Sequence, residues 1–381
     1  MKIEQRIWTK EKGWSPALSS PDGSGVELVI LFGSTALIKE KQQFQEIKKI
    51  YPNASWIGCS TAGEIYGTQV HDDSLVLTAV HFEKTKIKCV HQQITNINNS
   101  YEAGGNLAQQ LNADDLKHIF VLSEGINVNG SELVRGFNHK LLGKISVSGG
   151  LSGDAARFKE TFIISDGEVY KEGAVAVGFY GNNIKVGYGS LGGWDSFGPE
   201  RVVTKSRCNK LYELDGQLAL NLYKQYLGEH AKGLPATGLL FPLSLSTKSG
   251  EKEVVRTILA VDEKEQSMTF AGDIPENSTV RLMKANFNRL VDGAVGAAKN
   301  SLVPLDSMNA ELSILISCVG RKLILKQRTE EEVEGVRDVV GGQSILTGFY
   351  SYGEIAPFGA DFKECQLHNQ TMTITTFSEK V

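Results

Sequence analysis

Cysteine and proline are scarce in this sequence, and long apolar segments are absent. The chain has 5 cysteines among 381 residues, an odd number with no CxxC pair, which argues against a disulfide framework and a structural zinc site. No stretch approaches the roughly 20 apolar residues that span a bilayer. The N-terminal segment, MKIEQRIWTKEKGW, is polar and lacks the apolar centre of a signal peptide. We therefore expect a cytoplasmic protein that does not cross or bind a membrane.

An excess of charge of one sign is also missing. The 40 Lys and Arg residues nearly balance 44 Asp and Glu residues, for a net charge of −4. Binding of nucleic acid or of an anionic membrane surface needs a dense basic face, so neither partner is expected. Residues 187–192 fit GxGxxG, but the following GWDSFGP segment, with Pro199, cannot begin the helix that holds a dinucleotide. The nucleophile-elbow and phosphate-loop motifs are absent.

The sequence does contain an internal repeat and an excess of glycine, 40 residues against about 27 at an average frequency of ~7 %. Segments 26–82, 117–180 and 311–377 each show an apolar strand, an amphipathic helix, a second apolar strand that ends in small polar residues, and a further strand. In the third segment, Thr329 and Glu332 fit a capping box for the helix. The pattern predicts an α/β to α+β fold whose mixed sheets are built from repeated strand–helix–strand–strand units.

The region between the second and third copies has a different pattern. Short strands joined by Gly, Asp and Lys turns follow a helix that contains residues 218–226. The segment GGWDSFGPE, residues 192–200, interrupts all periodicity. We therefore predict two domains, an α/β domain over residues 1–200 and an α+β domain over residues 201–381.

Several segments together resemble a FIST-domain protein, with a FIST N-like first domain and a FIST C-like second domain. They are GCSTAGEI, SGGLSGDA, NKLYELDGQLALNLYKQYLG, ISCVGRK, GFYSYGEIAP and LHNQTMTITTF, and the last three are the specific part. The resemblance implies an intracellular sensory module for a small ligand in bacterial signal transduction, not an enzyme. One branch of the family is described as haem-binding nitric-oxide sensors that work with a histidine kinase. Because the chain carries no output domain, we expect a signalling partner such as a histidine kinase or a diguanylate cyclase.

Three glycine-rich turns are the candidate ligand site, because free backbone N–H groups gather where strands end and loops lead into helices. We expect the ligand between the two halves, with turn amides for a carboxylate, acidic groups for an amine and paired tyrosines for a flat molecule. The candidate ligand-binding residues are Gly58, Cys59, Ser60, Gly63, Glu64, Ser148, Gly149, Gly150, Asp154, Arg321, Tyr350, Tyr352, Glu354, His368 and Asn369.

A structural interpretation of the same residues stays open. The glycines are then needed only for positive φ and for close packing of strands. Arg321 either clamps a ligand anion with its planar guanidinium or forms a salt bridge within the protein. The tyrosines then fill the core, with their hydroxyls bonded to the backbone.

His368 is the candidate metal ligand, since neutral imidazole is the commonest protein ligand of haem iron and this residue precedes the last strand, beside the aromatic turn. Haem is then the expected cofactor. Two alternatives stay open: a sensor of amino acids or related small metabolites without haem, and an enzyme with Cys59 or Ser60 as nucleophile. The enzyme needs a base within reach of the nucleophile, and no motif supplies one.

Overall fold

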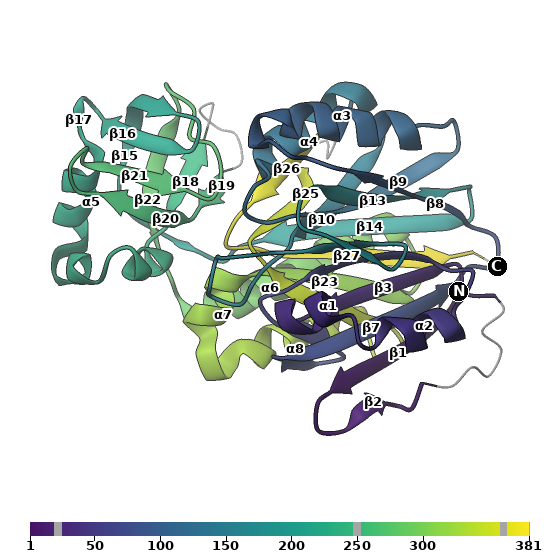
Figure 1. Cartoon of the computed structure of the whole chain (residues 1–381). Helices are drawn as coiled ribbons and strands as arrows, with labels where there is room; N and C mark the ends of the chain where they lie inside the picture. Colours follow the sequence, from purple (N-terminus) through teal and green to yellow (C-terminus); the bar gives the residue numbers. More distant parts are fainter. Residues whose placement is uncertain (19–24, 247–252, 359–363, 381) are drawn as a thin grey trace.

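The computed structural model describes residues 1–18, 25–246, 253–358 and 364–380. It has a large part with three mixed sheets, here called the body, and a smaller part with a fourth sheet, residues 195–284, here called the lobe (Figure 1). The body consists of the segments that precede and follow the lobe in the sequence. The predicted α/β to α+β class with mixed sheets is confirmed. Within the described ranges, no helix has the length and apolar content needed to cross a membrane.

Each sheet of the body is built around one copy of the repeat. Across the first sheet lie β12 (Glu168–Tyr170), β11 (Ile163–Ser165), β4 (Ser55–Ser60), β3 (Leu28–Gly33), β7 (Ser74–His81), β1 (Lys2–Thr9) and β2 (Gly13–Ser15). Across the second lie β26 (Glu364–His368), β25 (Gly353–Phe358), β10 (Ser146–Leu151), β9 (Leu116–Ser123), β13 (Ala174–Tyr180) and β8 (Lys86–Gln92). Across the third lie β14 (Ile184–Leu191), β27 (Met372–Glu379), β23 (Leu312–Cys318), β24 (Ile345–Ser351), β5 (Glu64–Tyr66) and β6 (Gln69–His71).

The three copies share one pairing pattern. The first two strands of each copy are parallel, β3 with β4, β9 with β10 and β23 with β24. The last strand of each, β7, β13 or β27, is antiparallel to the first. The helices between the parallel strands are α1 (Thr35–Glu40) with α2 (Phe44–Ile50), α4 (Gly130–Leu141), and α7 (Val319–Leu325) with α8 (Thr329–Val340). The predicted strand–helix–strand–strand units are therefore confirmed.

The hairpin that follows the second strand of each copy joins the sheet of another copy. The hairpin β5–β6 of the first copy pairs with β24, β11–β12 of the second pairs with β4, and β25–β26 of the third pairs with β10. In the second copy, β11 and β12 therefore lie at the edge of the first sheet and not beside β10. The exchange closes the three sheets into a ring, because each copy completes a neighbouring sheet.

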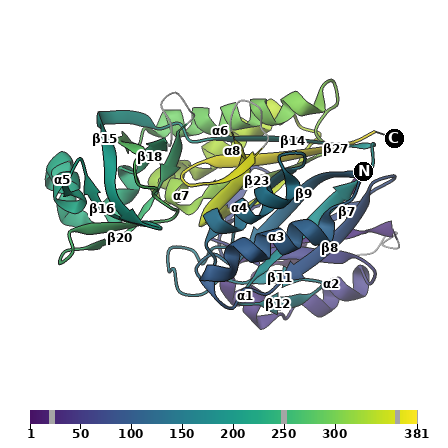
Figure 2. The ribbon, with the colours of Figure 1, turned by 90° about the horizontal axis from the view of Figure 1, so that it is seen from above.

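The sheets enclose one apolar core and are covered by helices outside. The inward faces supply fully buried side chains such as Phe32, Phe120 and Phe349. Outside, α3 (Ser100–Leu111) and α4 lie over the second sheet, while α6 (Phe287–Leu302) and α8 lie by the third (Figures 1 and 2). Helices α1 and α2 contribute Ile38, Phe44 and Ile47 to a separate outer core on the first sheet.

The lobe lies to one side of the body and has its own apolar core (Figure 2). Its elements are β15 (Asp195–Arg207), β16 (Lys210–Leu214), β17 (Gln217–Leu218), α5 (Ala219–Leu227), β18 (Leu243–Ser246), β19 (Val254–Arg256), β20 (Ile258–Asp262), β21 (Ser267–Phe270) and β22 (Thr279–Lys284). The predicted domain boundary at residue 200 lies within β15, and the chain after 286 returns to the body. Residues 1–200 and 201–381 therefore do not correspond to body and lobe.

Candidate functional site

The three glycine-rich turns, residues 58–64, 148–154 and 348–354, meet at one end of the body. They follow the second strands of the three copies, whose carboxyl ends converge there. Direct backbone hydrogen bonds link them. These bonds run from Ala62 N–H to the Tyr350 carbonyl (2.8 Å), from Gly153 N–H to the Ser60 carbonyl (2.9 Å) and from Tyr352 N–H to the Leu151 carbonyl (3.2 Å). The turns thus form a single junction between the sheets.

Three glycines in the second strands permit close packing of strands. A Cβ atom at Gly58, Gly149 or Gly348 would lie within 2.1, 1.8 or 1.9 Å of a carbonyl oxygen of the parallel first strand. A Cβ atom added at Gly150 would lie 2.8 Å from the Cγ2 atom of Ile316, so this glycine also permits close packing. These contacts give Gly58, Gly149 and Gly150 a structural reason to be glycine, which fits the structural interpretation of the three residues.

Gly63 and Glu64 line a cavity of about 520 Å³, here called the turn cavity. Gly63 has φ +139°, which favours glycine, and a Cβ there would collide with the Lys322 ammonium. The Glu64 carboxylate accepts hydrogen bonds from the Thr61 hydroxyl and from both the N–H (3.2 Å) and the hydroxyl (2.7 Å) of Ser74. Burial raises the pKa of Glu64 to about 7 against the opposing effect of these bonds.

Glu354 is held in the same way as Glu64. Ser351 Oγ (2.7 Å), Thr371 N (3.1 Å) and Thr371 Oγ (2.8 Å) donate to its carboxylate. Burial raises its pKa to about 8 in spite of these donors and of nearby Arg321. The two carboxyl groups are therefore equivalent structural features of the first and third copies.

The raised pKa of Glu354 predicts that the stability of the protein depends on pH. Its unfolded pKa is near the ordinary 4.5, so between pH 4.5 and 8 the folded state binds the extra proton, and stability from this group is lost as pH rises. Wild type should lose up to about 1.4 kcal/mol per pH unit relative to Glu354→Gln across this window. Urea unfolding of both proteins at pH 5, 6.5 and 8 checks this. A stability difference that does not vary with pH would contradict it.

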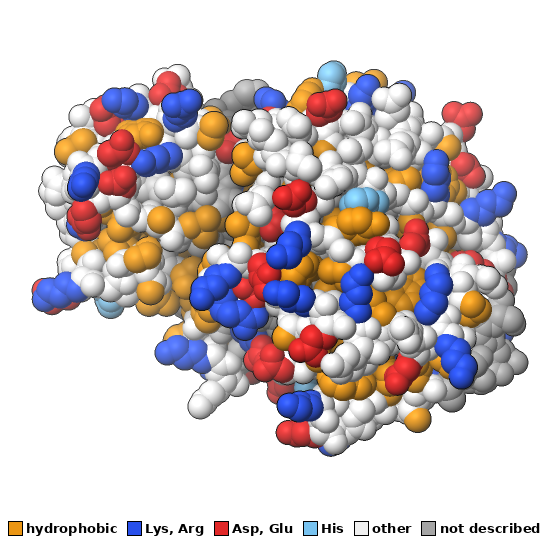
Figure 3. Space-filling model, viewed as in Figure 1, with side chains coloured by type: hydrophobic (Ala, Val, Ile, Leu, Met, Phe, Trp, Pro, Cys, Tyr) orange, Lys and Arg blue, Asp and Glu red, His pale blue; other side chains and the backbone are white. Residues whose placement is uncertain are grey.

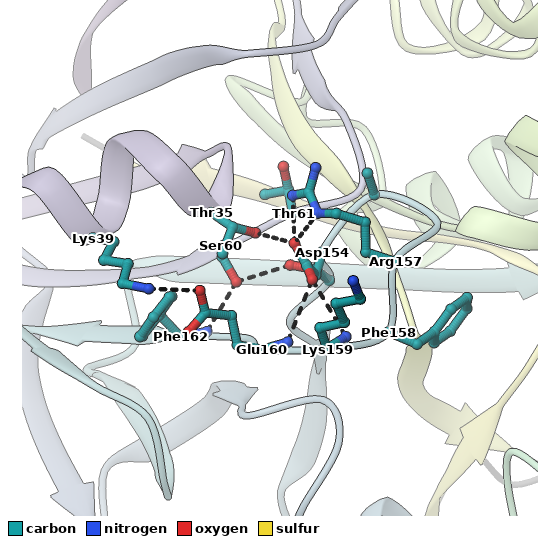
Figure 4. Close-up of polar contacts among 12 residues, drawn as sticks. Thr35, Lys39, Ser60, Thr61, Asp154, Arg157, Phe158, Lys159, Glu160 and Phe162 are labelled. Carbon is teal, nitrogen blue, oxygen red and sulfur yellow. Dashed lines mark hydrogen bonds and ion pairs between the residues drawn. The ribbon is translucent and has the colours of Figure 1, made fainter.

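Asp154 is engaged entirely by the chain around it (Figure 4). Thr35 Oγ1 (2.8 Å) and the Arg157 guanidinium donate to one carboxylate oxygen, and the N–H groups of Lys159 and Glu160, each at 3.3 Å, donate to the other. Burial alone would raise the pKa of Asp154, but the bonds from Arg157 and Thr35 outweigh it and hold the pKa below its usual value. Asp154 therefore fixes the 154–160 loop onto α1.

Arg321, Glu332 and Tyr350 form a buried network. The Arg321 guanidinium donates to Glu332 (3.0 and 2.7 Å) and to three backbone carbonyl groups, and both side chains of the pair have no exposed surface. Tyr350 donates its hydroxyl to Glu332 at 2.7 Å. The predicted capping box is wrong, since Glu332 binds this network instead of the helix start. Arg321 and Tyr350 do not line the cavity beside Gly63 and Glu64, and the salt-bridge interpretation of Arg321 fits the contacts.

The nucleophile alternative has no support from the contacts of its two residues. Cys59 is fully buried, and burial raises the pKa of its thiol well above the ordinary value. Ser60 is also fully buried; its hydroxyl donates to the Gly153 carbonyl (2.8 Å) and accepts from Phe162 N–H (2.9 Å). Ser148 likewise lies in the central core, bonded to His118 (2.8 Å). None of these three side chains is among the lining residues of the cavities described in this section.

The surroundings of His368 do not fit haem. Its side chain is buried, and burial lowers its pKa to about 4. It does not line the turn cavity or either cavity beside the lobe. Among the residues described, no three His, Cys, Asp or Glu side chains are grouped to hold a metal ion. The amide of the adjacent Asn369 is fully buried and has no hydrogen-bond partner in the described chain.

Tyr352 is the predicted aromatic residue that does reach a cavity. This cavity, of about 580 Å³, lies between the body and the lobe and is here called the interlobe cavity. The Tyr352 ring stacks on Phe158 with centroids 4.2 Å apart, and its hydroxyl bridges Phe158 N–H (3.1 Å) and the Ala155 carbonyl (3.3 Å). The residues that line the interlobe cavity are Ile97, Asn98, Gly125, Ile126, Val128, Asn129, Gly130, Glu132, Leu151, Phe158, Cys208, Asn209, Leu259, Phe270, Ala271, Gly272, Asp273 and Tyr352.

Several residues of the interlobe cavity were missed by the sequence reasoning. Ile97, Phe158 and Leu259 are 46 %, 44 % and 43 % exposed, so three large apolar side chains face one space. Asp273 and Glu132 supply the acidic groups, and none of the residues assigned to the lining carries a basic side chain. The sequence offered one signal for Phe158 as a cavity residue: it is an aromatic residue between Arg157 and Lys159 and lies outside any periodic segment.

Comparisons with known proteins confirm the resemblance to FIST-domain proteins. A model of the FIST N domain matches residues 27–217, and a model of the FIST C domain matches residues 219–357. An uncharacterized protein of Methanocaldococcus jannaschii is 26 % identical over 341 residues, which cover 81 % of this chain and 63 % of that protein. The chain thus spans less than two thirds of the length of this relative.

Two solved structures align over nearly the whole chain. A chorismatase is 8 % identical, with 99 % of this chain and 98 % of that chain covered and a TM-score of 0.36. A cyanuric acid hydrolase from A. caulinodans is 8 % identical, with 100 % and 99 % covered and a TM-score of 0.41. Similarity this low carries no argument about activity. The two family models together cover most of residues 27–357, and the chain therefore belongs to the FIST family of sensory domains in signal transduction.

Proposed function

We propose that the protein is a sensor that binds a small molecule in the interlobe cavity. The observation that carries this proposal is the position of the cavity, since the body lines one side of it and the lobe lines the other. Its volume of about 580 Å³ is in the usual range for small-molecule sites, which favour the space between domains. A ligand there touches two parts of the chain, and within the described residues the backbone passes between them near residues 191–195 and 284–287.

The lining favours an aromatic or apolar ligand that carries an amine. The stacked rings of Phe158 and Tyr352 offer a flat surface, and the bonds of the tyrosine hydroxyl hold it in place. Asp273 and Glu132 give the lining a negative charge, although Arg135 pairs with Glu132 on its exposed side, and the buried guanidinium of Arg256, which donates to the Asp273 carbonyl, also attracts the Asp273 carboxylate. An ammonium group near these carboxylates gains a charge-assisted hydrogen bond, whereas a ligand carboxylate is repelled. Of the alternatives, a sensor of small metabolites without haem is therefore favoured over haem, and an amine is favoured over an amino acid, whose carboxylate would be repelled.

Binding becomes a signal if the ligand prefers one arrangement of lobe and body. Polar contacts cross the boundary: Arg256 Nη1 donates to the Leu367 carbonyl at 2.9 Å, and Asn129 Nδ2 approaches Asp273 Oδ1 at 3.4 Å. The indole of Trp194, at the first crossing, donates to the Gln370 carbonyl at 2.9 Å. A ligand that bridges Phe158 and Asp273 would shift this equilibrium, and a partner such as a histidine kinase or a diguanylate cyclase would respond to it.

Titration calorimetry with phenethylamine, phenethyl alcohol and phenylacetate tests the proposed ligand class. The three probes share a ring and differ in charge, so we expect the amine to bind about tenfold more tightly than the alcohol and phenylacetate to bind weakest. Asp273→Asn should remove the preference for the amine, and Phe158→Ala should weaken all three probes. Asp306→Asn, at a carboxylate 81 % exposed and outside the cavity lining, is the matched control. Equal binding of the three probes, or no effect of Phe158→Ala, would contradict the proposal.

A further inference from the structure

We propose that the turn cavity is a second binding site, which takes a small oxyanion, the carboxylate or phosphate group of a metabolite. The cavity has a volume of about 520 Å³ and is lined by the first glycine-rich turn, the start of the 154–160 loop and α7. It shares no lining residue with the interlobe cavity. The proposal therefore stands apart from the proposed function.

An unpartnered buried hydroxyl faces this cavity. Ser34 follows β3 and is 6 % exposed, and its Oγ atom has no hydrogen-bond partner in the described chain. Its position is fixed, because its N–H donates to the Ser74 carbonyl at 3.0 Å and its carbonyl accepts from Ile38 N–H at 3.0 Å. An unsatisfied buried hydroxyl is costly, and a ligand oxygen would satisfy it as acceptor.

Three cationic side chains line the same cavity. Arg157 uses Nε and Nη2 on Asp154, which leaves Nη1 without an acceptor in the described chain. Lys322 donates to the Ala62 carbonyl at 2.9 Å and to Asp72. The exposed ammonium of Lys326 has no ion pair among the described residues. Lys and Arg side chains gather on the surface over the region of α7 (Figure 3). Free donors from three segments thus surround one space.

The acidic groups of the cavity are already engaged or lie in solvent. The Glu64 carboxylate accepts three hydrogen bonds from its own neighbourhood, and Asp72 pairs with Lys322. The Asp72 side chain is 67 % exposed, and Asp73 is exposed at the rim as well. Ser34, Arg157 Nη1 and Lys326 are the groups that have no acceptor in the described chain, and an oxyanion supplies one to all three.

Titration calorimetry with sodium sulfate and sodium acetate, at constant ionic strength and against sodium chloride, tests this inference. Tighter binding of sulfate assigns the site to a phosphate group, and tighter binding of acetate assigns it to a carboxylate. For the probe that binds, Ser34→Ala and Lys326→Gln should each lower the affinity about tenfold, the effect of one charge-assisted hydrogen bond.

Two controls separate this site from general electrostatics and from the interlobe cavity. Lys144→Gln removes an exposed cation that does not line the turn cavity, and Asp273→Asn alters the other cavity; neither should change the affinity for the anion. Thermal unfolding shows whether each variant is folded. Binding of neither probe above the chloride background, or equal binding by wild type, Ser34→Ala and Lys326→Gln, would overturn the proposal.

Discussion

Gly149→Ala is expected to abolish folding or to lower the free energy of unfolding by about 4 kcal/mol or more. Gly149 has φ +151°, and a Cβ atom there would lie 1.8 Å from the Val121 carbonyl oxygen and 2.7 Å from its carbon. Both atoms belong to the backbone of β9, so no side-chain rotation relieves the collision. The parallel strands β9 and β10 would have to separate at the centre of the second sheet. Urea unfolding of the purified variant measures the effect.

Gly342→Ala is the matched control. An added Cβ at Gly342 meets no atom within 4 Å, and its φ is not positive. This substitution should leave stability nearly unchanged. Similar stabilities for Gly149→Ala and Gly342→Ala would show that the close packing of the second strands is not what requires glycine.

Arg321→Met is expected to cost about 3–5 kcal/mol of stability. The change leaves Glu332 buried without its cationic partner, and the carbonyl groups of Gly192 and Leu290 lose the donor that Arg321 supplies. Tyr350 and Ser317 donate to Glu332 at 2.7 and 2.9 Å and compensate only in part. Chemical denaturation of the variant and wild type at pH 7 gives the difference directly.

The matched control is Arg328→Met, which breaks the exposed pair with Glu331. Little change is expected there, because exposed ion pairs contribute little to stability. The double variant Arg321→Met/Glu332→Leu removes both buried charges and should recover part of the loss. If Arg321→Met and Arg328→Met behave alike, the buried network is not a stabilising element.

The repeat could be predicted from sequence because it is local. Each copy carries a continuous apolar strand, a helix with its apolar residues at helical spacing, and a returning strand, and these signals lie within about 60 residues. The junction of the three turns followed from the same pattern, since the ends of parallel strands lie together. Gly63, Glu64 and Tyr352 were the candidate residues that reached the linings of the two cavities.

The exchange of hairpins could not be predicted in this way. The apolar pattern of β11 shows that the strand is buried, but it does not show which sheet edge the strand joins. Glu332 illustrates the same limit. Thr329 and Glu332 have the spacing of a capping box, yet the desolvated guanidinium of Arg321 binds this carboxylate instead, and that partner becomes visible only in the folded chain.

The interlobe cavity depends on contacts between segments far apart in sequence. Phe158 lies in a loop, Asp273 follows the last residues of β21, and neither belongs to a periodic pattern. His368 was predicted to face a ligand, whereas its side chain at the end of β26 is buried. Only the placement of the lobe against the second sheet brings Phe158 and Asp273 together.

Hydrogen exchange with and without saturating phenethylamine tests most directly whether a ligand binds between body and lobe. We expect slower exchange at residues 125–130 of the body and at residues 270–273 of the lobe in the same experiment, because both segments line the interlobe cavity. Residues 61–64, in the turn cavity, should exchange at unchanged rates. Protection confined to one wall of the interlobe cavity, or protection at 61–64 alone, would contradict the account.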